Sequence, residues 1–136
     1  MILAGTSAWV EYDRATGSPP HHRLRELIET DGSLAVTEPV IAEVLAGARD
    51  DRREADLRRL LTGFELLSFD PVTDFDAAVR IYRRCRAAGV TPRGMLDCLI
   101  AAVAWRRGAT LLAHDADIDR VARVIEVRLD EASLRT

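Results

Sequence analysis

The sequence alternates short apolar runs with longer amphipathic segments, and this alternation limits the folds that are open to it. Runs of strand length lie at 1–4, 34–37, 66–69, 109–113 and 124–129. Helical spacing lies between them, at 7–14, 21–31, 50–61, 74–88, 95–105, 117–123 and in a segment that opens at Glu38. Strands separated by helices of this length build a parallel sheet covered on both faces. We therefore expect an α/β fold, a three-layer α/β/α domain around a central, mainly parallel five-stranded sheet.

Length and composition fit one folded domain over 1–136. A chain of 136 residues buries roughly two-thirds of the surface that it exposes when unfolded. No run approaches the roughly 18 apolar residues of a membrane span, and no signal peptide is visible. Two cysteines in a domain with this much core argue against a disulfide scaffold. We expect a cytoplasmic protein with no membrane partner.

The basic residues exclude several classes of enzyme. All 19 of them are arginine, so no lysine is available for a P-loop, a Schiff base or a kinase site. The net charge of −3 gives no basic surface over the whole molecule. Any contact with nucleic acid must therefore be local, and Arg93, in the turn before Asp97, is the best single candidate for an RNA phosphate.

Four acidic residues fall where the predicted strands end or the predicted helices begin. Asp115 and Asp117 follow the fourth strand, Asp97 opens the most apolar helix, and Glu43 lies in the helix after the second strand. Each one alone also fits an ordinary helix cap or a solvated charge. Together, four carboxylates at one sheet edge would repel one another unless a cation neutralised them. Oxygen ligands favour Mg²⁺ or Mn²⁺, the metals that serve phosphodiester hydrolysis.

Four segments carry a resemblance to a known family. Residues 1–11 look like the opening strand of the PIN-domain ribonucleases, and Glu38–Gly47 resembles their second motif. Residues 96–102 and 113–119 resemble the third and fourth motifs. The four segments span the chain in the right order, and together they resemble the VapC toxins of bacterial type II (VapBC) toxin–antitoxin systems.

This resemblance implies both an activity and its residues. Glu43, Asp97 and Asp115 match the family's catalytic metal-site acids, Asp117 matches a further acid, and Ser7 matches the residue that supports the first acid. The family cleaves RNA, often tRNA or rRNA, with Mg²⁺ or Mn²⁺. Its members usually form homodimers, and a cognate VapB-type antitoxin blocks their site. The resemblance therefore implies an Mg²⁺- or Mn²⁺-dependent endoribonuclease.

The chain departs from the family pattern at Gly5. The first motif normally ends its strand in an aspartate before Thr-Ser, but here Gly5 precedes Thr6 and Ser7. Asp13 lies eight residues on and is no obvious replacement. Either the chain is a divergent or decayed toxin, or the glycine was introduced to silence a toxic nuclease. In both cases we expect metal affinity and catalysis to be strongly reduced. Loss of a residue that merely hydrogen-bonds to a metal ligand already lowers metal affinity or activity roughly 10–100-fold.

Two classes of function follow from these residues. The leading one is a metal-dependent endoribonuclease toxin, impaired by Gly5. The alternative is a non-catalytic PIN-like module that binds antitoxin or RNA without cleavage. A PIN-like nuclease outside toxin–antitoxin systems is a third, weaker reading.

Overall fold

Strands and helices alternate along the chain, and the computed structural model describes residues 1–135. The elements in chain order are β1 (Ile2–Ala4), α1 (Thr6–Asp13), α2 (Pro19–Glu29), β2 (Leu34–Val36), α3 (Glu38–Ala46), α4 (Asp51–Leu61), β3 (Glu65–Leu66), α5 (Pro71–Ala87), α6 (Met95–Arg107), β4 (Thr110–Leu112) and α7 (Ala116–Val124). Prolines in the first turn and side-chain caps set several helix starts. Ser18, for example, caps α2 by accepting from the His21 N–H.

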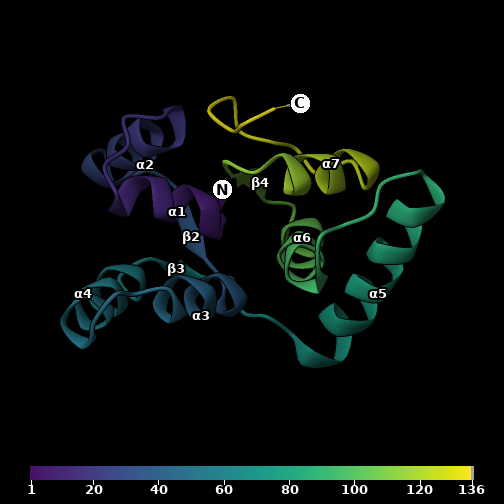
Figure 1. The fold of residues 1–136 in the computed structure, drawn as a ribbon, viewed down its shortest axis with the longest axis horizontal. Coiled ribbons are helices and arrows are strands. Elements are labelled where there is room, and N and C mark those ends of the chain that lie inside the picture. Colours follow the sequence, from purple (N-terminus) through teal and green to yellow (C-terminus); the bar gives the residue numbers. More distant parts are fainter. Residues whose placement is uncertain (136) are drawn as a thin grey trace.

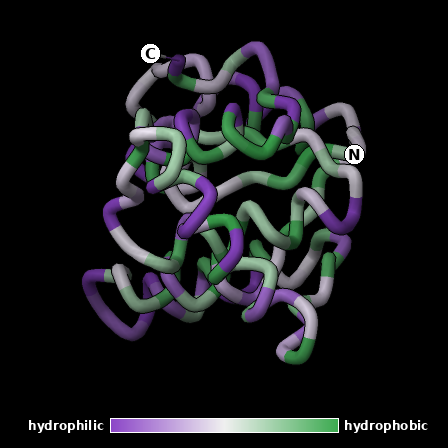
Figure 2. Tube along the Cα trace, turned by 90° about the vertical axis from the view of Figure 1, so that its right-hand side faces the viewer, coloured by the Kyte–Doolittle hydropathy of each residue, from purple (hydrophilic) through white to green (hydrophobic). Residues whose placement is uncertain are grey.

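The sheet is parallel and lies between two layers of helices. Its strand order is β3-β2-β1-β4, and β1 pairs with both β2 and β4. Figure 1 shows α1–α4 on one side of the strands and α5–α7 on the other. The residues of β1, β2 and β4 are mostly buried, whereas both residues of β3 at the edge of the sheet are exposed. In Figure 2 hydrophobic stretches of the tube run through the middle of the molecule. The three-layer α/β/α architecture predicted from the sequence is confirmed.

The predicted fifth strand is wrong, because the structure has four strands within the described residues. Helix α7 continues to Val124, and Glu126 takes a left-handed backbone conformation with a φ of 61°. An extended strand cannot pass through such a residue. Leu129 still reaches the sheet through an isolated parallel bridge to Leu111, made by hydrogen bonds of Leu111 with the Arg128 carbonyl and the Asp130 N–H. The third strand is also shorter than the predicted 66–69.

The buried face of α5 differs in part from the one that its apolar spacing predicts. Helical spacing over 74–88 predicts that Phe75, Ala78, Val79 and Tyr82 face inward. Ala78 is buried and Tyr82 packs against the core, but Phe75 is 54% exposed and Val79 is 48% exposed. The buried side chains are those of Asp74, Ala78, Ile81 and Cys85. Asp74 is buried because it accepts two hydrogen bonds from Arg106 on α6, and these help fix how α5 is rotated against α6. As a result, Val72, Phe75 and Val79 form an apolar stripe on α5 that faces outward.

The helix starts near the site differ slightly from the prediction. Thr6 and Ser7 are the residue types that commonly cap a helix, and the sequence predicts one of them as the N-cap of the first helix. In the structure Thr6 is already helical and Gly5 is the N-cap of α1. Asp97 is the third residue of α6, within the first turn as predicted. The N-terminal turns of α1, α6 and α7 thus bring Gly5, Asp97 and Asp115 toward one edge of the sheet.

The topology places a crevice between β1 and β4. The chain leaves β1 toward β2 on one side, whereas β4 lies on the other side. In open α/β sheets, ligands bind outside the carboxyl ends of the strands where the connections diverge in this way. Gly5 follows β1 and His114 follows β4, so both border this crevice.

Candidate metal centre

A cavity of about 270 Å³ opens at the carboxyl ends of β1 and β4. It is lined by the residues that the sequence singled out and by their neighbours: Gly5, Thr6, Ser7, Val10, Glu11, Glu43, Arg93, Asp97, Ile100, Asp115 and Ile118. These residues come from α1, α3, α6 and α7 and from the turns before α1, α6 and α7, so segments far apart in the chain meet here. Asp117 does not line the cavity but is joined to it through Arg93.

Two hydrogen bonds hold the segment after β4. The Ser7 hydroxyl accepts from the His114 backbone N–H at 2.8 Å, which ties α1 to this segment. Asp115 is the N-cap of α7, and its Oδ1 accepts from the Asp117 N–H at 2.9 Å. One oxygen of Asp115 is thus used to start the helix, and the other, Oδ2, is directed to Arg93.

Arg93 is the cation of the site. Its Nη2 donates to Asp115 Oδ2 at 2.5 Å and lies 3.8 Å from Asp97 Oδ2. Its Nη1 lies 3.2 Å from Asp117 Oδ2. The hydrogen bond to Asp115 raises the pKa of Arg93, so the guanidinium stays charged. The side chain is 65% exposed, so water weakens these pairs.

Asp97 is the most perturbed carboxyl group of the cavity. Burial raises its pKa to about 6, and the charges of Asp115, Glu43 and Asp117 add to this effect, while Arg93 opposes it. Its side chain is only 16% exposed. A buried carboxylate among other carboxylates is costly without a cation, and Arg93 offsets only part of that cost.

The space at Gly5 would accept a side chain. Its φ of −81° and ψ of 172° are open to any residue. A Cβ there would lie 3.5 Å from the Leu112 carbonyl oxygen and 3.9 Å from Ala113 Cβ, which are ordinary contacts. Glycine is therefore not required by the backbone at this position.

The donor set has the chemistry of a hard-metal site. Glu43, Asp97 and Asp115 offer only carboxylate oxygens around the cavity, and Arg93 already places a positive group among them. As they stand, no three acidic, histidine or cysteine side chains within residues 1–135 converge closely enough to hold a metal ion. The carboxylate oxygens fit Mg²⁺ or Mn²⁺ in chemistry, and the Arg93 guanidinium lies among them.

Glu11 is an acidic residue of the cavity that was not predicted as a site residue from the sequence, where it fits an ordinary position of the family pattern. It lies one helical turn after Ser7, and this i+4 spacing was the signal that put both on one face of α1. The Thr16 hydroxyl donates to Glu11 at 2.8 Å and is the largest cause of its lowered pKa. His114 Nε2 lies 3.7 Å away. These contacts hold the Glu11 carboxylate at the rim of the cavity, in the direction of Thr16.

The fold and the cavity define a class of protein, namely α/β/α domains with carboxylates at the switch point of a parallel sheet. A family model described as PIN domain matches residues 2–124. VapC ribonuclease Mb1587 of Mycobacterium bovis is 47% identical over 136 residues, which covers 99% of this chain and 100% of the relative. Ribonuclease VapC11 of Mycobacterium tuberculosis matches to the same extent. The chain therefore belongs to the PIN-domain family and, within it, to the VapC ribonucleases.

Solved structures share this fold. VapBC2 from Rickettsia felis, bound to a DNA fragment from its promoter, gives a TM-score of 0.76 at 21% identity and covers 98% of this chain and 99% of that one. FitAcB from Neisseria gonorrhoeae gives 0.71 at 19% identity, with 97% and 98% covered. The Mycobacterium tuberculosis toxin VapC20, which cleaves the sarcin-ricin loop, gives 0.64 at 18% identity, with 87% and 92% covered. Within residues 1–135, no helix has the length and apolar character needed to cross a membrane.

Proposed function

We propose that this chain is a metal-dependent endoribonuclease toxin of a toxin–antitoxin pair, with catalysis impaired by Gly5. One observation carries the proposal: Glu43, Asp97 and Asp115 surround a cavity at the sheet edge, with a guanidinium as their cation and no carboxylate at position 5. The VapC relatives at 47% identity support ribonuclease activity. We place this activity in the cytoplasm, where such RNA is found.

Different residues of the cavity would bind the metal, hold the segment after β4 and bind the RNA. Glu43, Asp97, Asp115 and Asp117 would hold Mg²⁺ or Mn²⁺, and Ser7 would keep the segment before Asp115 in place through its hydrogen bond. When bound, such a metal lowers the pKa of water and shields charge on a phosphate. Arg93 would leave the carboxylates as the metal enters, and its exposed guanidinium would then bind a phosphate of the RNA.

The proposed partners are a VapB-type antitoxin, RNA and a second copy of the chain. The neighbouring solved structures include toxin–antitoxin complexes, which supports an antitoxin for this chain. We propose tRNA or rRNA as the substrate, in line with a relative that cleaves the sarcin-ricin loop. The outward stripe of Val72, Phe75 and Val79 on α5 is the surface we propose for a homodimer.

The test compares this chain with its Gly5→Asp and Gly5→Asn variants. Both substitutions add a side chain of nearly the same size, and only aspartate adds a carboxylate. Each protein is incubated with total RNA and Mn²⁺ or Mg²⁺, with EDTA as a control, and Mn²⁺ affinity is measured by calorimetry. We expect Gly5→Asp to cut RNA in an EDTA-sensitive way and to bind Mn²⁺ at least tenfold more tightly than Gly5→Asn.

Other outcomes would revise the proposal. If all three proteins cut equally, position 5 lies outside the site. If none cuts any RNA, a second function leads, that of a module that binds antitoxin or RNA without cleavage. The observation that favours this second function is that Arg93 pairs with the carboxylates while Gly5 offers none.

A further inference from the structure

Trp105 lies on the surface, beside a hollow that shares no residue with the acidic cavity. It is 62% exposed, although the residues before it on α6, Ile100–Ala104, are all buried. The second tryptophan, Trp9, is fully packed in the core. An exposed indole offers a flat apolar face that a partner can cover.

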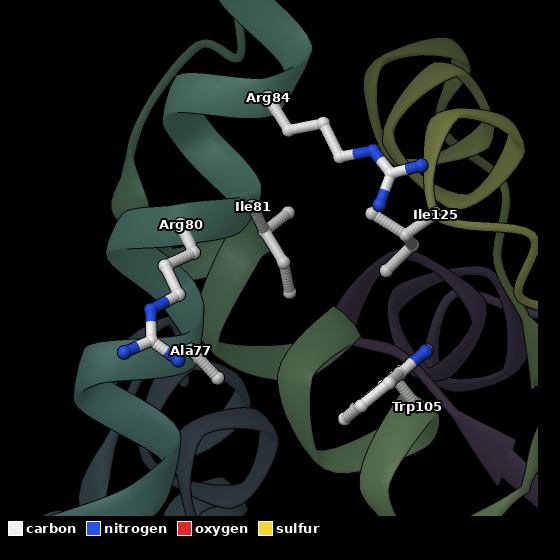
Figure 3. Close-up of a pocket in the computed structure, with 6 residues that line it drawn as sticks. All are labelled: Ala77, Arg80, Ile81, Arg84, Trp105 and Ile125. Atoms are coloured by element: carbon white, nitrogen blue, oxygen red, sulfur yellow. The ribbon is translucent and has the colours of Figure 1, made fainter.

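The hollow lies where α5, α6 and the end of α7 meet. It has a volume of about 230 Å³ and is lined by Ala77, Arg80, Ile81, Arg84, Trp105 and Ile125. Figure 3 shows Arg80 and Arg84 extending from α5, with Arg84 reaching across toward Ile125 and the Trp105 ring opposite. Apolar side chains thus form the walls, and two guanidinium groups lie over them.

The charge of the hollow is positive. Among the residues that the structure describes, no acidic side chain lines it. Within residues 1–135, Arg84 forms no ion pair and no side-chain hydrogen bond, while Arg80 pairs with Asp76 at 2.9 Å on the exposed face of α5. Trp105 also borders a second hollow of about 270 Å³, whose lining includes Arg128 and one acidic residue, Glu126. The hollow with Arg80 and Arg84 is therefore the more positive of the two.

We propose that this hollow binds one nucleobase and an adjacent phosphate of single-stranded RNA, and this inference rests on the proposed ribonuclease function. The base would stack on Trp105, and Arg84 would bind the phosphate. The size favours a base over a protein segment, because the hollow is smaller than the roughly 300–1,000 Å³ of a drug-sized site and suits a single planar ring. An arginine without an acidic partner complements a phosphate backbone.

The position of the hollow explains how it would serve cleavage. Asp97 and Trp105 lie on the same helix, eight residues apart, which is about 12 Å along the helix axis. An RNA strand held at the acidic cavity would therefore have to extend beyond it to reach Trp105. The hollow would act as a secondary subsite that selects RNA with a flexible single-stranded flank.

The experiment measures RNA binding without cleavage. A fluorescein-labelled 12-nucleotide uridine RNA, and an adenosine RNA of the same length, are titrated with the full chain in EDTA. Anisotropy gives the affinity, and tryptophan emission reports on Trp105, because Trp9 is buried. We expect RNA to quench this emission, Trp105→Ala to weaken binding about tenfold, and Trp105→Phe to keep it within about threefold.

Charge is tested with a matched pair of arginines. Arg84→Ala should weaken binding several-fold and reduce the salt dependence by about one phosphate contact. Arg52→Ala is the control, because Arg52 is an exposed arginine on α4 that forms no ion pair within residues 1–135, and it should leave binding nearly unchanged. Unchanged melting temperatures would show that the variants remain folded.

Three results would overturn the inference. The first is that Trp105→Ala binds RNA as tightly as the parent chain. The second is that RNA does not change the tryptophan emission. The third is that Trp105→Ala changes the oligomeric state in sedimentation, which would make the hollow a protein interface. Cleavage by Gly5→Asp is scored separately, so quenching without cleavage rejects the proposed function but keeps this subsite.

Discussion

Replacing Asp97 with asparagine should stabilise the metal-free protein at neutral pH and leave its stability near pH 4 unchanged. Burial and the neighbouring carboxylates raise the pKa of Asp97 from 3.8 to about 6. Between these values the folded state holds a proton that the unfolded chain has released. The stability of the parent protein therefore falls as pH rises from about 4 to about 6, and the loss is complete above that range.

The magnitude follows from the same two values. A tenfold change in proton affinity corresponds to about 1.4 kcal/mol, so the difference between 3.8 and about 6 corresponds to about 3 kcal/mol. Asparagine keeps the shape of the side chain and never ionises. We expect Asp97→Asn to exceed the parent in free energy of unfolding by about 2–3 kcal/mol at pH 7.5, and by almost nothing at pH 4.

Urea denaturation in EDTA, followed by circular dichroism at four pH values and constant ionic strength, measures this difference. Asp76→Asn is the control, because Asp76 is exposed on α5 and, within residues 1–135, pairs only with Arg80 on the same helix. It should change stability by less than about 1 kcal/mol at every pH. Parallel pH profiles for the parent and Asp97→Asn, or a destabilised Asp97→Asn at pH 7.5, would refute the electrostatic account of the cavity.

Three further substitutions test other parts of the structure. Arg93→Gln should bind Mn²⁺ several-fold more tightly in calorimetry, because no guanidinium has to leave the carboxylates; equal or weaker affinity would contradict this role. Arg106→Ala should cost about 3–5 kcal/mol in urea denaturation, because it leaves the fully buried Asp74 without its cation, and a cost below 1 kcal/mol would argue against the pair. Phe75→Asp should shift the protein toward monomer in sedimentation while its melting temperature holds, because Phe75 is exposed in the single chain; an unchanged oligomeric state would rule out this face as the dimer surface.

Some residues of the site could be predicted from the sequence and others could not. Asp97 and Asp115 could be predicted because each lies at the start of a helix, where local spacing fixes the direction of the side chain. The role of Arg93 could be predicted only in part. Its place in the turn before Asp97 predicted that it lies at the site. Its contacts with Asp115 and Asp117 could not be predicted, because they join residues more than 20 positions apart. Such contacts depend on how α6 and α7 meet.

The buried face of α5 also could not be predicted from the sequence. An apolar spacing that includes Phe75 and Val79 is as good a helical pattern as the one that is buried. The choice between the two faces depended on Asp74, a charged residue that pattern reasoning treats as solvent-facing and that Arg106 draws inward. The end of α7 is a similar case, because the left-handed conformation of Glu126 has no signature in residue type.

The sequence by itself determined the βα alternation, the parallel sheet and the carboxylates that meet at its carboxyl edge. These features depend on local periodicity and on the rule that parallel strands end at the same edge, and both can be read along the chain. Only the tertiary structure decided which face of α5 is buried, that the sheet has four strands within residues 1–135, and that Arg93 pairs with Asp115 and Asp117. Those outcomes arise from contacts between residues distant in sequence, whose energies are comparable and are resolved only when the layers pack together.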